Sequence, residues 1–375
     1  MQRPPCANLR YEAVMPLNHY VTLGRSGLRV SPFCLGAMTF GDDWGWGSDV
    51  ATSQRILDTF LDRGGNFIDT ANAYTKGHSE KILGDHLGRV PSRRDRVVLA
   101  TKFFANLFPG DPNGGGASRK AIFAQCEESL RRLQTDYIDL YWLHCWDRLT
   151  PIEETLRALD DLVAAGKVRY VGFSDTPAWK VAEAQTIARF RGFSPVIALQ
   201  LEYSLAERTI EGELVPCAEE LGLGITPWSP LKQGLLSGKY TRANAGQQKG
   251  DRSGVESLLN ERLYTIIDGL VDVARELQTT PAAVALAWVQ GRPGVTATIV
   301  GARTLEQLNQ NLAALDVALT AEQRKRLDKL SEPTLNFPYH FVRSVGPMVS
   351  FGGTTINGTT GKPWPSAPKG DGDRY

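Results

Sequence analysis

The chain has 375 residues, enough for one large domain or two ordinary ones. Hydrophobic residues make up 42% of the chain and charged residues 22%, proportions typical of a globular protein. Lys and Arg total 42 against 41 for Asp and Glu, which gives a formal net charge of +1. With no block of like charge either, the composition disfavours a nucleic-acid-binding protein and one attracted to an acidic membrane.

The N-terminal sequence and the cysteines indicate a compartment. The first residues, MQRPPCANLR, lack the apolar run of a secretory signal, and no stretch approaches the length of a transmembrane helix. The five cysteines are scattered and form no CxxC pair: Cys6, Cys34, Cys126, Cys145 and Cys217. This pattern favours reduced thiols over a disulfide framework or a zinc site. We therefore expect a cytoplasmic protein with no metal and no membrane contact.

Short apolar runs bounded by turn residues recur along the chain. Each is brief, rich in Val, Ile, Leu or aromatic residues, and not alternating, as expected of strands that are buried on both faces. The runs lie near residue 34 and at 66–70, 96–103, 137–145, 168–174, 195–203, 223–228 and 296–302. Before them, residues 19–33 carry GRSG between two short apolar pieces, which predicts a β-hairpin.

Segments of helical period separate these runs. Residues 51–64 place four apolar side chains on one helical face, Ser118 is an expected N-cap, and Gly166 an expected helix end. Further helices are expected after 176–180, at 209–214 and at 303–312. Strands alternating with helices predict an α/β fold, and eight such strands predict a (β/α)8 TIM barrel with the hairpin capping its bottom.

The barrel and the C-terminal residues differ in composition. We expect one barrel domain over residues 19–332, followed by a C-terminal substrate-loop segment and flexible tail over 333–375. Residues 351–375 are dense in Gly, Pro, Thr and Ser and offer little to bury. No second domain is predicted.

Four polar residues stand at the expected ends of three adjacent strands. Asp69 ends the second run, Tyr74 follows in its loop, Lys102 ends the third and His144 the fourth. Taken singly, such residues are usually caps, solvated lysines or core histidines. Because the active site of this kind of barrel lies where strands end, their joint placement predicts a catalytic cluster.

The residue types of this cluster suit the reduction of a carbonyl group. The reaction needs a proton donor as negative charge develops on oxygen. A free tyrosine, with a pKa of about 10, is a poor acid, and a nearby ammonium lowers that pKa. We therefore expect Tyr74 to be the acid and Lys102 to lower its pKa. Asp69 would keep Lys102 charged, and His144 would orient the substrate oxygen.

Eight collinear segments resemble the successive motifs of the aldo-keto reductase superfamily. They are FIDTANAY, GHSEKILG, ATKF, DYIDLYWLH, VRYVGFSD, LQLEYSL, TPWSPLKQGLLSGKY and IVGARTLEQLNQN, and they run in order over residues 31–312. The chain is most similar to the bacterial branch related to potassium-channel β-subunits and glyceraldehyde-phosphate-type reductases. The resemblance implies NADPH-dependent reduction of aldehydes or ketones to alcohols, with Asp69, Tyr74, Lys102 and His144 as the catalytic tetrad.

The resemblance also implies residues that bind NADPH or NADP+. Ser174 and Gln200 would bind the nicotinamide carboxamide, and Trp228 would stack on the ring. The loop that wraps the pyrophosphate would supply Ser229, Leu231, Gly234 and Lys239.

After the last strand, Gly301 and Arg303 begin a turn into a helix, a natural phosphate site in this fold. Arg303 would bind the 2′-phosphate, and Gln307 and Asn311 the adenosine. The alternative is an amphipathic helix that begins with a solvated arginine.

Asp175 departs from the family, which usually has Asn there. A carboxylate only accepts hydrogen bonds, so it would favour the NH2 end of the carboxamide, and its charge would favour the oxidised coenzyme. The alternative is that Asp175 caps the helix that starts near Pro177.

The substrate pocket is the least specified part of the site. Among its candidate aromatic residues, Trp46, Phe103, Phe104 and Phe337 rank below Trp44 and Trp146. We expect substrate choice to depend on loops at 41–47, 104–117 and 232–258 and on the C-terminal segment. The sequence predicts a small carbonyl or alcohol substrate, but neither its identity, the reaction direction nor the oligomeric state.

Three rival functions fit the sequence less well. An NADP-binding regulatory subunit with little turnover would share the fold, but related channel subunits replace the histidine that is retained here as His144. A metal-dependent hydrolase lacks ligands, because the sequence has no HxH or HExxH pattern. A Rossmann dehydrogenase is disfavoured because no GxGxxG follows the first strand.

Overall fold

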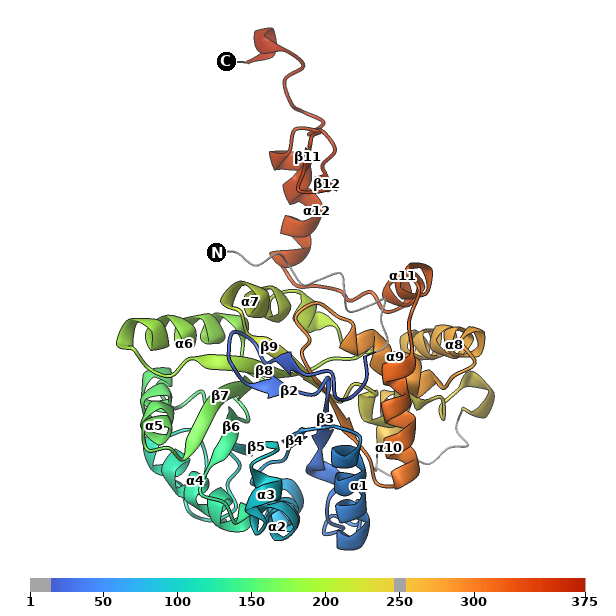
Figure 1. Cartoon of the computed structure of the whole chain (residues 1–375). Helices are drawn as coiled ribbons and strands as arrows, with labels where there is room; N and C mark the ends of the chain where they lie inside the picture. The colour runs from blue at the N-terminus through green and yellow to red at the C-terminus, as the bar shows by residue number, and fades with distance from the viewer. Residues whose placement is uncertain (1–14, 246–253, 375) are drawn as a thin grey trace.

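Eight parallel strands form a barrel with helices around it (Figure 1). The computed structural model describes residues 15–245 and 254–374. The strands lie side by side in the order β10-β3-β4-β5-β6-β7-β8-β9. They are β3 (Phe33–Gly36), β4 (Phe67–Asp69), β5 (Val98–Phe103), β6 (Ile138–Leu143), β7 (Val168–Ser174), β8 (Val196–Glu202), β9 (Gly224–Trp228) and β10 (Thr298–Gly301). Each strand falls within one of the predicted apolar runs, which confirms the (β/α)8 barrel.

The barrel is nearly closed where the last two strands meet. The Ile225 N–H donates to the Gly294 carbonyl over 2.9 Å, and the Thr296 N–H donates to the Ile225 carbonyl over 2.8 Å. Helices surround the barrel, so strands such as β5 are covered on both faces, and all six residues of β5 are buried.

The surrounding helices alternate with the strands as predicted, and the expected N-cap and helix-end residues are found where the sequence indicated them. Ser118 caps α4 by accepting from the Ala121 N–H, and Gly166, at φ 72°, follows the end of α5. The helices are α1 (Val50–Asp62), α2 (His78–Leu83), α3 (Pro91–Arg94), α4 (Arg119–Leu133), α5 (Ile152–Ala164), α6 (Ala178–Arg191), α7 (Leu214–Leu221), α8 (Glu261–Glu276), α9 (Pro281–Gln290), α10 (Leu305–Leu312) and α11 (Ala321–Leu330).

The predicted hairpin is present at the amino ends of the barrel strands. Strands β1 (Val21–Thr22) and β2 (Arg29–Val30) pair antiparallel. Leu23 and Val30 are fully buried in a cluster with barrel residues, and the Arg25 N–H donates to the Gly222 carbonyl, just before β9. The hairpin therefore covers the bottom of the barrel, away from the carboxyl ends of the strands.

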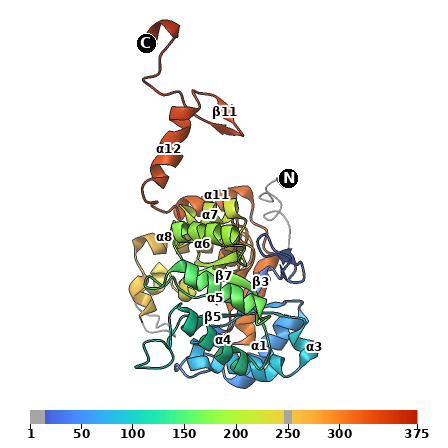
Figure 2. The same ribbon diagram turned by 90° about the vertical axis from the view of Figure 1, so that its left-hand side faces the viewer.

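The C-terminal residues form an arm of their own. They form α12 (Tyr339–Ser350) and a short hairpin of β11 (Thr355–Ile356) and β12 (Thr359–Thr360). Figures 1 and 2 show this arm projecting away from the barrel, and its side chains are largely exposed.

Membrane-spanning helices and clusters of metal ligands are both absent from the described part of the chain. Within residues 15–245 and 254–374, no helix has the length and apolar character needed to cross a membrane. In the same part of the chain, no three His, Cys, Asp or Glu side chains are grouped so that they could bind a metal ion.

Candidate active site

A cavity of about 670 Å³ opens at the carboxyl ends of the strands. Five of the residues that line it are the last residues of their strands: Gly36, Asp69, Ser174, Trp228 and Gly301. Its volume falls in the range of small-molecule and cofactor sites. The fold therefore places the cavity where barrel enzymes hold their substrates.

The buried ammonium of Lys102 connects the predicted catalytic residues. It donates to the Asp69 carboxylate, to the Thr70 carbonyl over 2.8 Å and to the Tyr74 hydroxyl over 3.1 Å. An ammonium has three protons, so its donors are all used. Tyr74 accepts in this contact, which leaves its own proton for another acceptor. The second oxygen of Asp69 accepts from the Gln200 amide over 3.0 Å.

Lys102 remains charged although it is fully buried. Burial lowers its pKa, but the charge of Asp69 and the contact with Tyr74 more than offset this, so the pKa is raised overall. A buried charge is tolerated where a partner and hydrogen bonds compensate for lost water. The cluster therefore keeps a fixed positive charge beside the Tyr74 hydroxyl.

Two opposing effects act on the pKa of Tyr74. Lys102 lowers it, as expected, but burial raises it by more, and the net shift is upward. The sequence indicates the neighbouring charge but not the loss of water around the phenol. The raised pKa keeps Tyr74 protonated at neutral pH, as a proton donor must be.

His144 faces Tyr74 across the mouth of the barrel. Its half-buried ring lies edge-on to the Tyr74 ring, with centroids 5.9 Å apart and planes at 81°. Burial and the charge of Lys102 lower the pKa of His144 to about 3. The imidazole is therefore neutral at physiological pH and can orient an oxygen by hydrogen bonding without adding charge.

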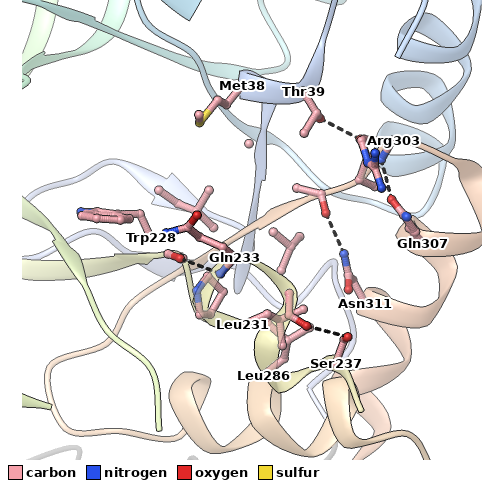
Figure 3. Close-up of a pocket in the computed structure, with 18 of the residues that line it drawn as sticks. Met38, Thr39, Trp228, Leu231, Gln233, Ser237, Leu286, Arg303, Gln307 and Asn311 are labelled. Atoms are coloured by element: carbon pink, nitrogen blue, oxygen red, sulfur yellow. Dashed lines mark hydrogen bonds between the residues drawn. The ribbon is translucent and has the colours of Figure 1, made fainter. Parts of the chain in front are cut away.

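Every predicted cofactor residue lines the same cavity as Asp69, Tyr74 and His144. These residues are Ser174, Asp175, Gln200, Trp228, Ser229, Leu231, Gly234, Lys239, Gly301, Arg303, Gln307 and Asn311. Figure 3 shows Trp228 on one side of the cavity and Arg303, Gln307 and Asn311 on the other. The predicted nicotinamide and adenosine contacts thus lie at separate parts of one cavity.

The turn from β10 into α10 is held by its own side chains. The Arg303 N–H donates to the Gln307 side chain over 2.8 Å, and the Asn311 amide donates to the Gly301 carbonyl over 3.0 Å (Figure 3). Thr39, from the loop after β3, donates to the Ala302 carbonyl over 2.8 Å. Gln307 and Asn311 therefore fix the backbone from which the Arg303 guanidinium projects.

The lining residues suit a phosphorylated dinucleotide. Lys239 and Arg303 supply positive charge, and α10 begins at this end of the cavity with the partial positive charge of a helix N-terminus. Gly234 has φ 94°, and a Cβ built there would meet no atom within 4 Å. Space is therefore open at this point of the loop, and the backbone has a conformation that residues other than glycine rarely adopt.

The aromatic candidates for the substrate pocket divide into two groups. Trp46 lines the cavity. Trp44 is not among the lining residues of the cavity, but its ring packs 5.5 Å from Trp46 and 6.5 Å from Tyr74. The Trp44 and Trp46 rings form an aromatic wall beside the Tyr74 ring. Trp46, ranked lower from the sequence, is thus the more direct contact.

Trp146, the other favoured candidate, does not line this cavity. The loop after β6 turns it outward, where its ring packs on Trp179 at 5.4 Å and lines a separate depression of about 380 Å³. Among the lower-ranked candidates, Phe103 is fully buried in the core, Phe104 packs against that core and Phe337 is 82% exposed on the C-terminal arm.

The predicted substrate loops contribute unequally. The loops at 41–47 and 232–258 supply lining residues, although residues 246–253 lie outside the described part of the chain. Within the described residues, neither the loop at 104–117 nor any residue of 333–375 lines the cavity. The expected role of the C-terminal segment in substrate choice stays a prediction.

Asp175 does not cap a helix. The N-cap of α6 is Pro177, and no side chain makes a capping hydrogen bond there. The Asp175 carboxylate instead accepts from the Trp228 indole N–H over 3.1 Å. Although Asp175 faces the open cavity, the protein around it limits its hydration, and this raises its pKa to about 6 against a smaller lowering by the Trp228 contact.

Several lining residues were not predicted. Met38 and Thr39 follow β3, where the position after a strand is itself a signal. Gln233 and Ser237 lie in the loop already assigned to the pyrophosphate. Leu286 reaches the cavity from α9, and nothing in its local sequence marks it.

Together, the barrel, the Asp-Tyr-Lys-His cluster at its carboxyl edge and the adjoining cavity define an oxidoreductase barrel. The family model described as Aldo/keto reductase family matches residues 32–332, and the chain belongs to this family. The more specific branch, related to channel β-subunits, stays a prediction.

Curated relatives cover nearly the same span. The chain is 42% identical to the "Uncharacterized oxidoreductase YrpG" of Bacillus subtilis, over 83% of this chain and 95% of the relative. It is 36% identical to the "Norsolorinic acid reductase" of Aspergillus flavus, over 86% and 84%. It is also 36% identical to the "Aryl-alcohol dehydrogenase [NADP(+)]" of Phanerodontia chrysosporium, over 84% and 86%.

Proposed function

We propose that this protein transfers hydride between NADPH and an aldehyde or ketone, producing an alcohol, with Tyr74 as general acid. The observation that carries the proposal is the bonding of Lys102 to both Asp69 and the Tyr74 hydroxyl beside the cavity. The names of two relatives, a reductase and an NADP(+)-dependent dehydrogenase, support the same chemistry.

Four residues of the chain would carry the reaction at the carbonyl oxygen. NADPH, when bound, supplies the hydride that adds to the carbonyl carbon. Neutral His144 and the Tyr74 hydroxyl hold the oxygen by hydrogen bonds, which fixes the angle of the carbonyl. As negative charge develops on that oxygen, Tyr74 gives up its proton. Lys102 already contacts the phenol oxygen and stabilises the phenolate, while Asp69 keeps Lys102 charged.

The coenzyme would lie along the cavity with its ends held differently. Ser174, Gln200 and Trp228 would hold the nicotinamide, and Arg303 the 2′-phosphate. A guanidinium forms paired, charge-assisted hydrogen bonds with phosphate, so Arg303 would favour NADPH over NADH.

For the substrate, we favour aromatic aldehydes and ketones. Trp46 and Trp44 form an aromatic wall next to Tyr74, and a flat ring stacks well on such a surface. The printed names of two relatives refer to an aryl alcohol and to norsolorinic acid.

The catalytic unit is residues 19–332 under this proposal, because the arm after it supplies no described residue to the cavity. Cytoplasmic location is part of the proposal; the described cysteines, Cys34, Cys126, Cys145 and Cys217, are all free thiols. An NADP-binding regulatory subunit remains the rival function. The complete tetrad, with His144 retained, favours an enzyme.

The decisive experiment adds NADPH and 4-nitrobenzaldehyde to the purified protein and follows NADPH absorbance. We expect loss of NADPH with formation of the alcohol, and slower loss with an aliphatic aldehyde of similar size. Tight NADPH binding without turnover across a panel of carbonyl compounds would support the regulatory subunit. Binding of neither NADPH nor NADP+ would refute both functions.

A further inference from the structure

Asp175 and Trp228 connect the ends of two strands across the strand between them. Asp175 directly follows β7, Trp228 ends β9, and Gln200 lies in β8 between them. The Asp175 N–H donates to the Gln200 carbonyl over 3.2 Å, and its carboxylate accepts from the Trp228 indole. The contact therefore ties the rim of the cavity together at its predicted nicotinamide end.

The backbone at Asp175 is itself unusual. Its φ of 42° lies in the left-handed region, which residues other than Gly, Asn and Asp seldom adopt. Asp is therefore one of the few residue types suited to this backbone position. Here it presents the carboxylate to the cavity and to Trp228 instead of to the first turn of α6.

The charge of Asp175 is less compensated than that of Asp69, the other acidic residue lining the cavity. Asp69 is paired with Lys102, whereas the partner of Asp175 is a neutral indole. Two charged groups from neighbouring elements affect the pKa of Asp175. Glu202, which Lys232 contacts at 2.7 Å, raises it, and Lys102 lowers it. The charge of Asp175 in turn raises the pKa of Tyr74 and of Cys145.

We infer that Asp175 positions the Trp228 ring and, through its negative charge, favours the oxidised coenzyme over the reduced one. The inference rests on the proposed function, because it needs a nicotinamide at this end of the cavity. The oxidised nicotinamide ring carries a positive charge and the reduced ring carries none, so a nearby carboxylate attracts only the oxidised form. Asp175 would thus shift the enzyme toward alcohol oxidation and slow the release of NADP+ after reduction.

The effect is moderate in size and depends on pH. Two unit charges in contact in water attract by an amount equivalent to roughly fivefold in affinity. The pKa of Asp175 is about 6, so its charge is present above that pH and is lost below it. His144, with a pKa of about 3, and Lys102, whose pKa is raised, keep their charge states through this range. The preference for NADP+ should therefore decline as the pH falls below about 6.

The positioning of Trp228 is tested without coenzyme. In a ¹⁵N-labelled protein, the indole N–H signal of Trp228 is identified by its loss in Trp228→Phe. We expect that signal to shift with pH around a midpoint near 6 and to show no such midpoint in Asp175→Asn. A signal with the same pH dependence in native protein and Asp175→Asn would overturn the link between the two residues.

The charge effect is tested by titrating NADP+ and NADPH into native protein, Asp175→Asn and the control Asp62→Asn. Asp62 is an exposed residue at the end of α1, outside the set of cavity-lining residues, and the control makes the same charge change. Above the pKa of Asp175, we expect Asp175→Asn to weaken NADP+ binding roughly fivefold and to leave NADPH binding nearly unchanged. Below it, native protein should resemble the variant.

Two outcomes would refute the inference in different ways. Equal weakening of both coenzyme forms in Asp175→Asn, or an equal effect in Asp62→Asn, would show that the Asp175 carboxylate does not discriminate between them. If native protein binds neither form, the proposed function fails and the coenzyme part of the inference fails with it. The indole titration still decides whether Asp175 positions Trp228, because it needs no coenzyme.

Discussion

The Lys102 ammonium donates a hydrogen bond to the Tyr74 hydroxyl over 3.1 Å, and the acceptor is the atom that would lose a proton in carbonyl reduction. In this direction of bonding, the charge of Lys102 stabilises the phenolate, while the phenol proton stays available to the substrate. Burial meanwhile raises the pKa of Tyr74, so the proton is retained until substrate oxygen becomes basic.

Tyr74→Phe removes the proposed proton donor and little volume. We expect kcat to fall by about 10²-fold or more, the size of a general-acid contribution, while NADPH affinity barely changes. Steady-state kinetics and coenzyme titration measure both quantities. Tyr264→Phe, on α8, is the matched control and should retain native kinetics. Near-native kcat in Tyr74→Phe would exclude Tyr74 as the acid.

Asp69→Asn should destabilise the fold, because it leaves the fully buried Lys102 ammonium without its charged partner. Removal of one member of a buried ion pair costs about 3–5 kcal/mol of unfolding free energy. The double variant Asp69→Asn/Lys102→Met removes the orphaned charge and should recover part of that loss. Urea unfolding of the three proteins measures the difference. A double variant that is no more stable than Asp69→Asn would contradict the argument.

Because the pKa of His144 is lowered, we expect the free energy of unfolding to depend on pH. Its pKa is about 3 in the folded protein against 6.5 when unperturbed, so below 6.5 the unfolded chain binds a proton that the folded chain does not. The stability linked to His144 is therefore complete above 6.5 and decreases as the pH falls toward 3. Unfolding free energies measured across this range should fall less steeply in His144→Gln. Parallel curves for the two proteins would rule out this assignment.

The sequence predicted those parts of the fold that depend on local pattern. Parallel strands covered on both faces need unbroken apolar runs, and all eight strands fall within such runs. Helix α9 carries no such signal, because eight of its ten residues are buried and no polar face gives it a helical period. The Gly- and Pro-rich composition at the end of the chain gave no signal for the hairpin of β11 and β12.

The site was predictable where strand ends determine it and unpredictable where loops do. Asp69 and Lys102 lie in the adjacent strands β4 and β5, and Gln200 lies in β8 of the same parallel barrel, so their convergence at the carboxyl end of the barrel follows from the topology. Trp146 sits in a loop whose direction depends on packing against α6, and the sequence does not encode that direction. The partner of Asp175 was missed because Trp228 lies 53 residues further along the chain.

Arg303→Ala tests the proposed coenzyme preference. Arg303 lines the end of the cavity opposite Trp228, on a turn held by Gln307 (Figure 3). Loss of a charge-assisted contact to the 2′-phosphate costs about 1.5–3 kcal/mol, or roughly 10- to 150-fold in affinity. NADPH binding should weaken by that factor and NADH binding should hardly change, since NADH has no 2′-phosphate.

The control separates this contact from a general effect of charge. Arg275→Ala removes an exposed arginine on α8 that pairs with Asp272 and does not line the cavity. We expect native affinities for both coenzymes in this variant. If Arg303→Ala weakened the binding of NADPH and NADH equally, the residue would shape the cavity without binding the 2′-phosphate. Equal use of both coenzymes by native protein would count directly against Arg303 as the determinant, because a guanidinium that binds the 2′-phosphate must favour the coenzyme that carries it.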